Sequence, residues 1–200
     1  MLKMLVLGVV VALGASSAAY ARLVQRIRSH GVVLAPRQQI APVKVIHYTQ
    51  FDPAWGSDVM GSSRTTLRES GCLVTVLASN LRHLGVRTTP GELNARLGLL
   101  HGYTRDGSVI WSRFKASQKG IQPQYRHVFS SRVVEQDLLN QRLPMVQIRR
   151  GWLQRPHWLL VVGADARDFL VMDPARRSAT PARLGQYGRC LLYTSDAADE

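Results

Sequence analysis

Cysteine is scarce in this sequence, and no metal-binding motif accompanies it. Two cysteines among 200 residues are too few for a disulfide framework, and no Cys-x-x-Cys motif or zinc-like Cys and His spacing occurs. His83 fits the last turn of a helix, where the dipole favours a cation. The remaining histidines apart from His157 lack acidic or cysteine neighbours at ligand spacing. We therefore expect no metal and no cofactor.

Acidic residues are also few. There are 13 of them against 26 basic residues, which gives a net charge of +13 at pH 7. Such a charge favours nucleic acid, anionic lipid or an acidic polymer as a partner. A nucleic-acid surface normally gathers its charge on one face or helix, whereas the basic residues from Arg64 to Arg189 are scattered with no run longer than two. We therefore do not expect nucleic acid as a partner, and membrane or cell-envelope association stays open.

The length and apolar content indicate one folded domain. Two hundred residues correspond to one ordinary domain with short extensions, which excludes a multidomain enzyme. With 46% hydrophobic and 20% charged residues, the chain has enough apolar material for a core and is not compositionally disordered.

The N-terminus has the layout of a secretory signal. Met4–Ala21 is uncharged, follows Lys3 and ends in Ala-Tyr-Ala, a pattern typical of a cleavage site. The same stretch is just long enough to span a bilayer uncut, and the arginines that begin at Arg22 oppose export of the chain behind them. A cleaved signal, a retained anchor and an anchor facing the cytoplasm all stay open. We expect an exported protein that is secreted or held at the cell envelope.

Four segments follow from these patterns. Pro36 and Pro42 punctuate a stretch without periodicity, and the last residues, LLYTSDAADE, match no core pattern and resemble translated sequencing-adapter DNA. We expect a signal peptide or membrane anchor over 1–21, a linker over 22–42, a domain over 43–190 and a non-native tail over 191–200.

Hydrophobic periodicity predicts helices first and strands second. The predicted helices are 72–84, 89–98, 108–118 and 131–142, and the predicted strands are 43–50, 145–148, 158–162 and 169–172. The second helix is the best delimited, because Thr89-Pro90-Gly91-Glu92 satisfies the capping box. This order predicts an α+β fold.

Cys72 stands at the first residue of a predicted helix, after Gly71. The helix dipole and the unpaired amide donors there favour a thiolate anion, which is an activated nucleophile. A lone cysteine is more often a small buried residue, so its partners decide between the two interpretations.

His157 and Asp173 are predicted to meet across a hairpin. They flank two apolar runs and lie at equal distances from Asp165 in the predicted turn, so a shift of one or two residues still leaves them neighbours. Gln50, at the end of a predicted strand, can supply an amide to an oxyanion hole together with the Cys72 N–H. Taken singly, each of the three is more often a solvated strand end or a turn residue.

At these residues the chain resembles the C39-like peptidases, papain-fold relatives of the bacteriocin-leader peptidases. The resemblance covers residues 47–175 and rests on Gln50-Phe51-Asp52-Pro53-Ala54-Trp55, Thr65–Thr75 with Gly-Cys-x-x-Thr, Gly85–Asn94 with Thr-Pro-Gly-Glu-Leu, His157-Trp158 and Met172-Asp173-Pro174. It implies a papain-like cysteine peptidase fold, with N-terminal helices packed on an antiparallel sheet. It further implies Cys72 as nucleophile, His157 as base, Asp173 as the group orienting that base, and Gln50 in the oxyanion hole.

Two departures from the family's pattern accompany the resemblance. The closing strand expected after Asp-Pro falls where Cys190 and the predicted tail stand, and no transporter or ATPase motif occurs, so the leader-processing role does not follow. We expect a cysteine peptidase that hydrolyses a peptide or other amide bond. The alternative is a non-catalytic module of the same fold that binds peptide or cell-wall material.

Overall fold

The computed structural model describes residues 19–23, 25, 31–118, 121–126, 129–150 and 155–198. Within these ranges six strands form one sheet in which every neighbouring pair is antiparallel. Across the sheet the strands are β1 (Ile121–Arg126), β6 (Cys190–Ala198), β2 (Pro144–Arg150), β3 (Arg155–Ala164), β4 (Phe169–Met172) and β5 (Ala182–Arg183).

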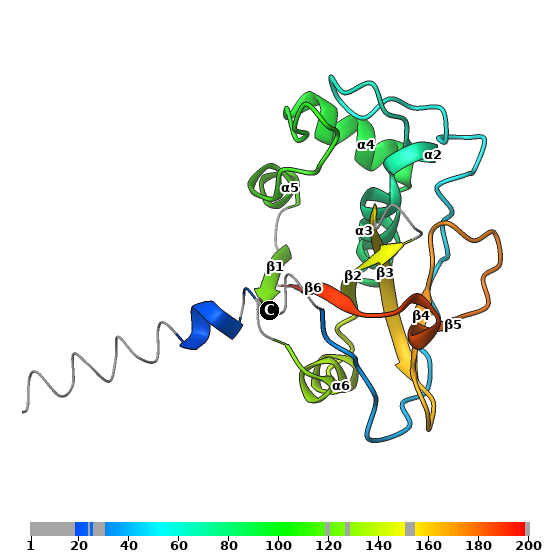
Figure 1. The fold of residues 1–200 in the computed structure, drawn as a ribbon. Helices are drawn as coiled ribbons and strands as arrows, with labels where there is room; N and C mark the ends of the chain where they lie inside the picture. The colour runs from blue at the N-terminus through cyan, green and yellow to red at the C-terminus, as the bar shows by residue number, and fades with distance from the viewer. Residues whose placement is uncertain are drawn as a thin grey trace, which may run out of the picture.

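The helices precede most of the sheet in the sequence. They are α2 (Leu67–Ser70), α3 (Cys72–His83), α4 (Pro90–Leu99), α5 (Trp111–Ser117) and α6 (Ser131–Leu139), and a 3-10 helix, η1 (Leu184–Tyr187), follows β5. In Figure 1, α2 to α5 gather in the upper half of the molecule, whereas α6 lies at the other end near the sheet. α3 packs on β3 and on α4, and α6 packs on β2. The α+β prediction is confirmed.

α3 is the helix that builds the core. All eight residues from Val74 to Leu81 are buried. A helix that is covered on every side lies in the interior, and here β3 and α4 supply the cover. Its first turn is less enclosed, and Cys72 is half-buried. α3 therefore holds its N-terminal residue at the edge of the core.

The predicted start of α4 is confirmed atom by atom. Thr89 Oγ1 accepts a hydrogen bond from the Glu92 N–H at 3.2 Å, and the Glu92 carboxylate accepts one from the Thr89 N–H at 2.8 Å. Pro90 occupies the first helical position, where its missing N–H costs nothing.

The strand predicted over 43–50 is wrong. The segment is extended, but only the Val43 N–H bonds to β3, at the carbonyl of Val162. Ile40 pairs with Ala164 on the same edge of β3. Between Arg155 and Leu160 that edge is occupied by β2, so the segment has no free strand to pair with and leaves the sheet.

Part of the predicted linker is anchored to the domain. Val32 pairs with Cys190, and Leu34 is buried. The buried carboxylate of Glu135 on α6 accepts hydrogen bonds from the backbone N–H groups of Arg37 and Gln38. Since a buried carboxylate needs donors, these contacts fix the course of the chain before residue 43.

The predicted tail contributes a strand. β6 (Cys190–Ala198) lies between β1 and β2 and pairs with both. Strand pairing uses backbone groups that almost every residue carries, so the pairing does not tell whether residues 191–200 are native. Their non-native origin stays a prediction.

The predicted signal or anchor lies almost wholly outside the described residues, which begin at residue 19. Among the helices that the structure does describe, none has the length and apolar character needed to cross a membrane.

Candidate active site

Gly71 joins α2 to α3 and sets the position of Cys72. A side-chain carbon at Gly71 would lie 2.7 Å from the Cα of Leu67 and closer still to its carbonyl oxygen, so only glycine allows this junction. The Gly71 carbonyl accepts hydrogen bonds from the Thr75 N–H at 2.9 Å and the Thr75 hydroxyl at 2.8 Å. The Gly-Cys-x-x-Thr motif is therefore a fixed helix start that presents Cys72.

His157 and Asp173 meet as predicted. His157 Nε2 lies 2.7 Å from Asp173 Oδ1, and both residues are buried, with 6% and 3% of their surfaces exposed. The hairpin pairs Leu160 with Met172, so its register is offset from the predicted symmetry about Asp165. Asp173 then lies diagonally opposite His157, within the reach that cross-strand neighbours have.

Three donors hold the Asp173 carboxylate. Oδ1 accepts from the Ala175 N–H at 2.8 Å as well as from His157, and Oδ2 accepts from the Tyr187 hydroxyl at 3.0 Å. Burial by itself would raise the pKa of Asp173, but these hydrogen bonds and the charge of His157 lower it. The carboxylate is therefore ionised and fixed in direction.

The imidazole of His157 favours its charged form. Burial by itself would lower the pKa of His157, but hydrogen bonds to Asp173 and Cys72 and the charges of both groups raise it to about 9. At neutral pH the ring is therefore an imidazolium between the Asp173 carboxylate and the Cys72 sulfur.

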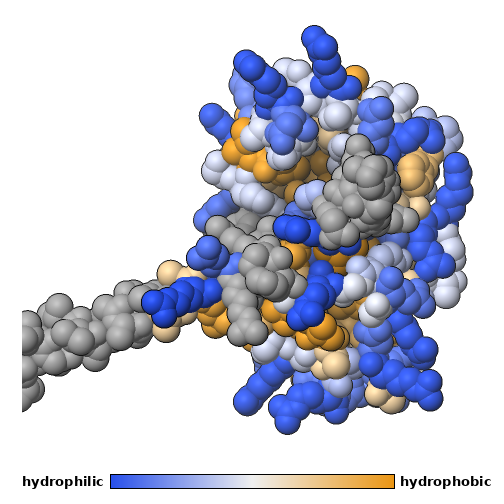
Figure 2. All heavy atoms as spheres, viewed as in Figure 1, coloured by the Kyte–Doolittle hydropathy of each residue, from blue (hydrophilic) through white to orange (hydrophobic). Residues whose placement is uncertain are grey.

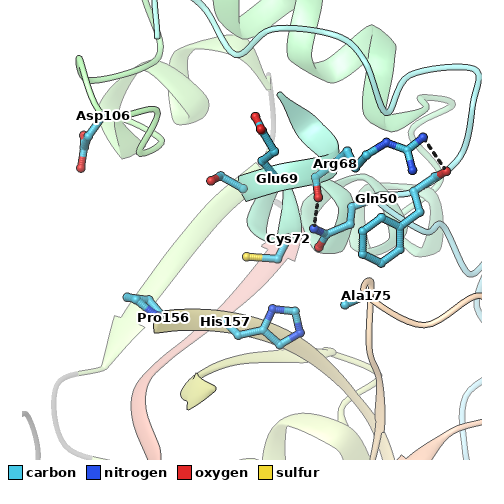
Figure 3. Close-up of a pocket in the computed structure, with 10 residues that line it drawn as sticks. Gln50, Arg68, Glu69, Cys72, Asp106, Pro156, His157 and Ala175 are labelled. Carbon is cyan, nitrogen blue, oxygen red and sulfur yellow. Dashed lines mark hydrogen bonds between the residues drawn. The ribbon is translucent and has the colours of Figure 1, made fainter. Parts of the chain in front are cut away.

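Cys72 faces the free side of that ring. Because Asp173 occupies Nε2, Nδ1 is the nitrogen that remains for the thiol. Figure 3 shows the sulfur of Cys72 and the ring of His157 on opposite walls of one cleft. α3 supplies the thiol and the β3–β4 hairpin supplies its two partners.

Gln50 lies beside the same cleft and is 6% exposed. Its backbone N–H donates to the Pro174 carbonyl at 2.9 Å, which ties it to the turn after Asp173. Its Nε2 donates to the Arg68 carbonyl at 2.7 Å (Figure 3), while its buried Oε1 has no hydrogen-bond partner among the described residues. The structure thus brings all four predicted site residues to one place.

The cleft has a volume of about 750 Å³ and also contains charged groups. Arg68, Glu69 and Asp106 lie along its walls. Figure 2 shows hydrophilic side chains projecting around the outline of the molecule, with hydrophobic atoms visible between them. In the described part of the chain, no three His, Cys, Asp or Glu side chains come together as metal ligands.

Tyr187 is the site residue that the sequence analysis missed. It lies in η1, in a stretch with no hydrophobic periodicity and no recognisable motif. Burial, the charge of Asp173 and the hydrogen bond to it raise the pKa of Tyr187, so the phenol stays protonated and donates. The only sequence signal is a tyrosine following an Asp-Pro turn, which is too common to predict a contact.

Solved structures share this fold. A C39-like peptidase from Bacillus anthracis superposes with a TM-score of 0.56 at 10% sequence identity, over 82% of this chain and 99% of that one. The chain has the fold of the C39-like peptidases. The predicted papain-like arrangement of helices on an antiparallel sheet is thereby confirmed.

A second similar structure is the peptidase domain of Streptococcus ComA, a bifunctional ABC transporter of a quorum-sensing pathway. It has a TM-score of 0.45 and 19% identity over 64% of this chain and 91% of that domain. No protein-family profile and no curated protein sequence matches this chain.

Proposed function

We propose that this protein is a thiol-dependent hydrolase that cleaves a peptide or other amide bond. The observation that carries the proposal is the buried 2.7 Å contact between His157 and Asp173, in the same cleft as the helix-start thiol of Cys72. A nucleophile, a base and a group that orients the base are the three parts that covalent catalysis of acyl transfer requires.

The reaction uses each part in turn. Cys72 Sγ, its proton transferred to His157, attacks the carbonyl carbon of the scissile amide. The imidazolium then gives its proton to the leaving nitrogen, the C–N bond breaks and a thioester remains. A water molecule, deprotonated by His157, attacks the thioester and releases the acid and the free thiol. Asp173 keeps Nδ1 of the His157 ring directed at the Cys72 sulfur and stabilises the charged form of that ring.

The oxyanion hole combines the Cys72 backbone N–H with the amide of Gln50. Nε2 of Gln50 has two hydrogens, of which the Arg68 carbonyl takes one and the second serves the oxyanion.

The test is turnover of an internally quenched peptide library, analysed by mass spectrometry. Cys72→Ala and His157→Ala should each abolish cleavage, and the double variant should be no worse than either, because the two groups act in one step. His101→Asn is the matched control, since His101 is an exposed loop histidine with φ of 51°, which asparagine tolerates. Cleavage by Cys72→Ala at the wild-type rate refutes the proposal.

One outcome favours the binding module instead. If the wild-type protein cleaves nothing, but it and Cys72→Ala bind the same peptides with equal affinity, then the cleft is a recognition site without chemistry.

We further propose that the protein acts outside the cytoplasm, as a secreted or envelope-held enzyme. The uncharged Met4–Ala21 stretch with its Ala-Tyr-Ala ending supports this location. Mass spectrometry of the expressed chain should find a terminus at Arg22 or the full-length chain in the membrane fraction. Uncut protein in the cytoplasmic fraction rules out both.

A further inference from the structure

A second cavity opens directly beside the catalytic cleft. It has a volume of about 380 Å³ and shares Ser70, Cys72, Asp106 and Pro156 with the cleft. Neither His157 nor Gln50 lines it, whereas both line the cleft. The second cavity therefore lies on a different side of Cys72 from the His157 and Gln50 part of the cleft. We call this second cavity the Trp111 pocket.

Apolar side chains form most of the walls of the Trp111 pocket, and Ser108 and Gln147 add polar groups to them. Met60, Val109, Trp111 and Trp158 line it together with Leu73 and Val74 of α3. Met60 and Val74 are 1% exposed, and Val109 and Trp158 are 8% exposed. These side chains belong to the core and turn part of their surface towards the pocket.

Aromatic packing holds the pocket in shape. The rings of Trp111 and Trp158 are 6.1 Å apart at 67°, and those of Trp111 and Phe114 are 5.9 Å apart at 88°. Edge-to-face pairs of this kind stabilise one orientation of each ring. The pocket is therefore formed before any ligand enters.

Cys72 fixes the position of the pocket relative to the reacting groups. It lines both the Trp111 pocket and the cleft that contains His157. Whatever fills the pocket is therefore held next to the bond under attack. Such a position selects among substrates, because binding energy there orients the carbonyl towards the thiol.

Charge is confined to the mouth. Asp106 lies on the rim, where hydrogen bonds from Thr104 and Ser108 lower its pKa and keep it ionised. Apolar walls below an ionised rim favour an apolar side chain inside and leave the polar peptide backbone outside.

We infer that the Trp111 pocket is a specificity site for a large aliphatic or aromatic side chain within three residues of the scissile bond. This inference rests on the proposed function, and it adds the class of substrate: peptides with an apolar residue at that place, with glycine disfavoured.

The experiment uses matched peptides in which each of the three positions on either side of the cleaved bond is glycine, leucine or phenylalanine in turn. At one position kcat/KM for leucine or phenylalanine should exceed that for glycine by about 10- to 150-fold, as expected for burying one apolar side chain. Trp111→Ala should reduce this ratio at least several-fold, and Val109→Phe should reduce it for phenylalanine by narrowing the pocket. Leu139→Ala, on the exposed face of α6, should leave it unchanged.

The ratio separates recognition from damage to the fold. Both substrates are measured on one preparation, so the fraction of folded enzyme cancels. Cleavage with no preference for apolar residues at any position, or a preference that survives both variants, overturns the inference and leaves the hydrolase proposal intact. If no peptide is cleaved, the hydrolase proposal fails. Calorimetric binding of the same peptides to Cys72→Ala then tests the inference about the pocket separately. Equal affinities for the glycine and phenylalanine peptides overturn that inference.

Discussion

Asp173→Asn tests the electrostatics of the site most directly. The pKa of His157 is about 9, against an ordinary histidine value of 6.5. This difference corresponds to on the order of 3 kcal/mol in favour of the imidazolium, at about 1.4 kcal/mol for each tenfold change in the protonation equilibrium. Burial opposes the rise, and hydrogen bonds and charges on Asp173 and Cys72 cause it. Without the carboxylate, we expect the pKa of His157 to fall well below 9 towards the ordinary value.

The same change has a defined sign for stability. A histidine whose pKa is higher in the folded state contributes stability that is fully present below the unfolded value and is lost as pH rises through the folded value. For His157 that window runs from 6.5 to about 9. Wild-type protein should therefore lose stability across this window, and Asp173→Asn should lose less.

The assays are an NMR titration of the His157 ring and urea denaturation at pH 6 and pH 9.5. Asp165→Asn is the matched control. It removes a charge from the turn of the same hairpin, where Asp165 bonds to Arg183 at 2.8 Å and not to His157. We assign the Asp173 carboxylate as the group that keeps His157 protonated. This assignment is refuted if the pKa of His157 is unchanged in Asp173→Asn, or if it falls equally in both variants.

Three further predictions concern single residues. Gln50→Glu keeps the shape of the side chain but replaces its amide donors with a charge, and should lower kcat by about 10²- to 10³-fold. A fall in kcat smaller than the fall caused by the same substitution at an exposed glutamine contradicts the oxyanion role. Burial and the nearby charge of Asp168 raise the pKa of Cys190 to about 12. Iodoacetamide at pH 8 should therefore label Cys72 in the folded protein, but Cys190 only in denaturant. Peptide mapping of the labelled protein measures this difference. Gly71→Ala should destabilise the fold by about 1 to 3 kcal/mol in urea titration, because the added carbon meets the backbone of Leu67.

The sequence predicted best what depends on neighbouring residues. The start of α3 follows from an apolar stripe behind Gly71, and the start of α4 follows from a capping box within four residues. The meeting of His157 and Asp173 follows from a short hairpin. Its register was offset, yet the contact forms because diagonal neighbours across a hairpin are still within hydrogen-bonding reach.

For features that depend on distant parts of the chain, the sequence supplied either no prediction or a wrong one. The segment 43–50 has the residues of a strand, but β2 already occupies the edge of β3 that it approaches. β1 pairs with β6, far away in the sequence, through backbone groups whose partners no side-chain pattern specifies.

Local sequence therefore determined which groups form the candidate site: a thiol at a helix start, and an imidazole and a carboxylate at one end of a hairpin. Only the tertiary structure decided what surrounds them. Packing of α3 on β3 brings the thiol to the ring, η1 brings the Tyr187 hydroxyl to Asp173, and Trp111 reaches Trp158 across the neighbouring pocket. The physical reason is that hydrogen bonding and helix capping act over a few residues, whereas burial depends on every element that packs against a side chain.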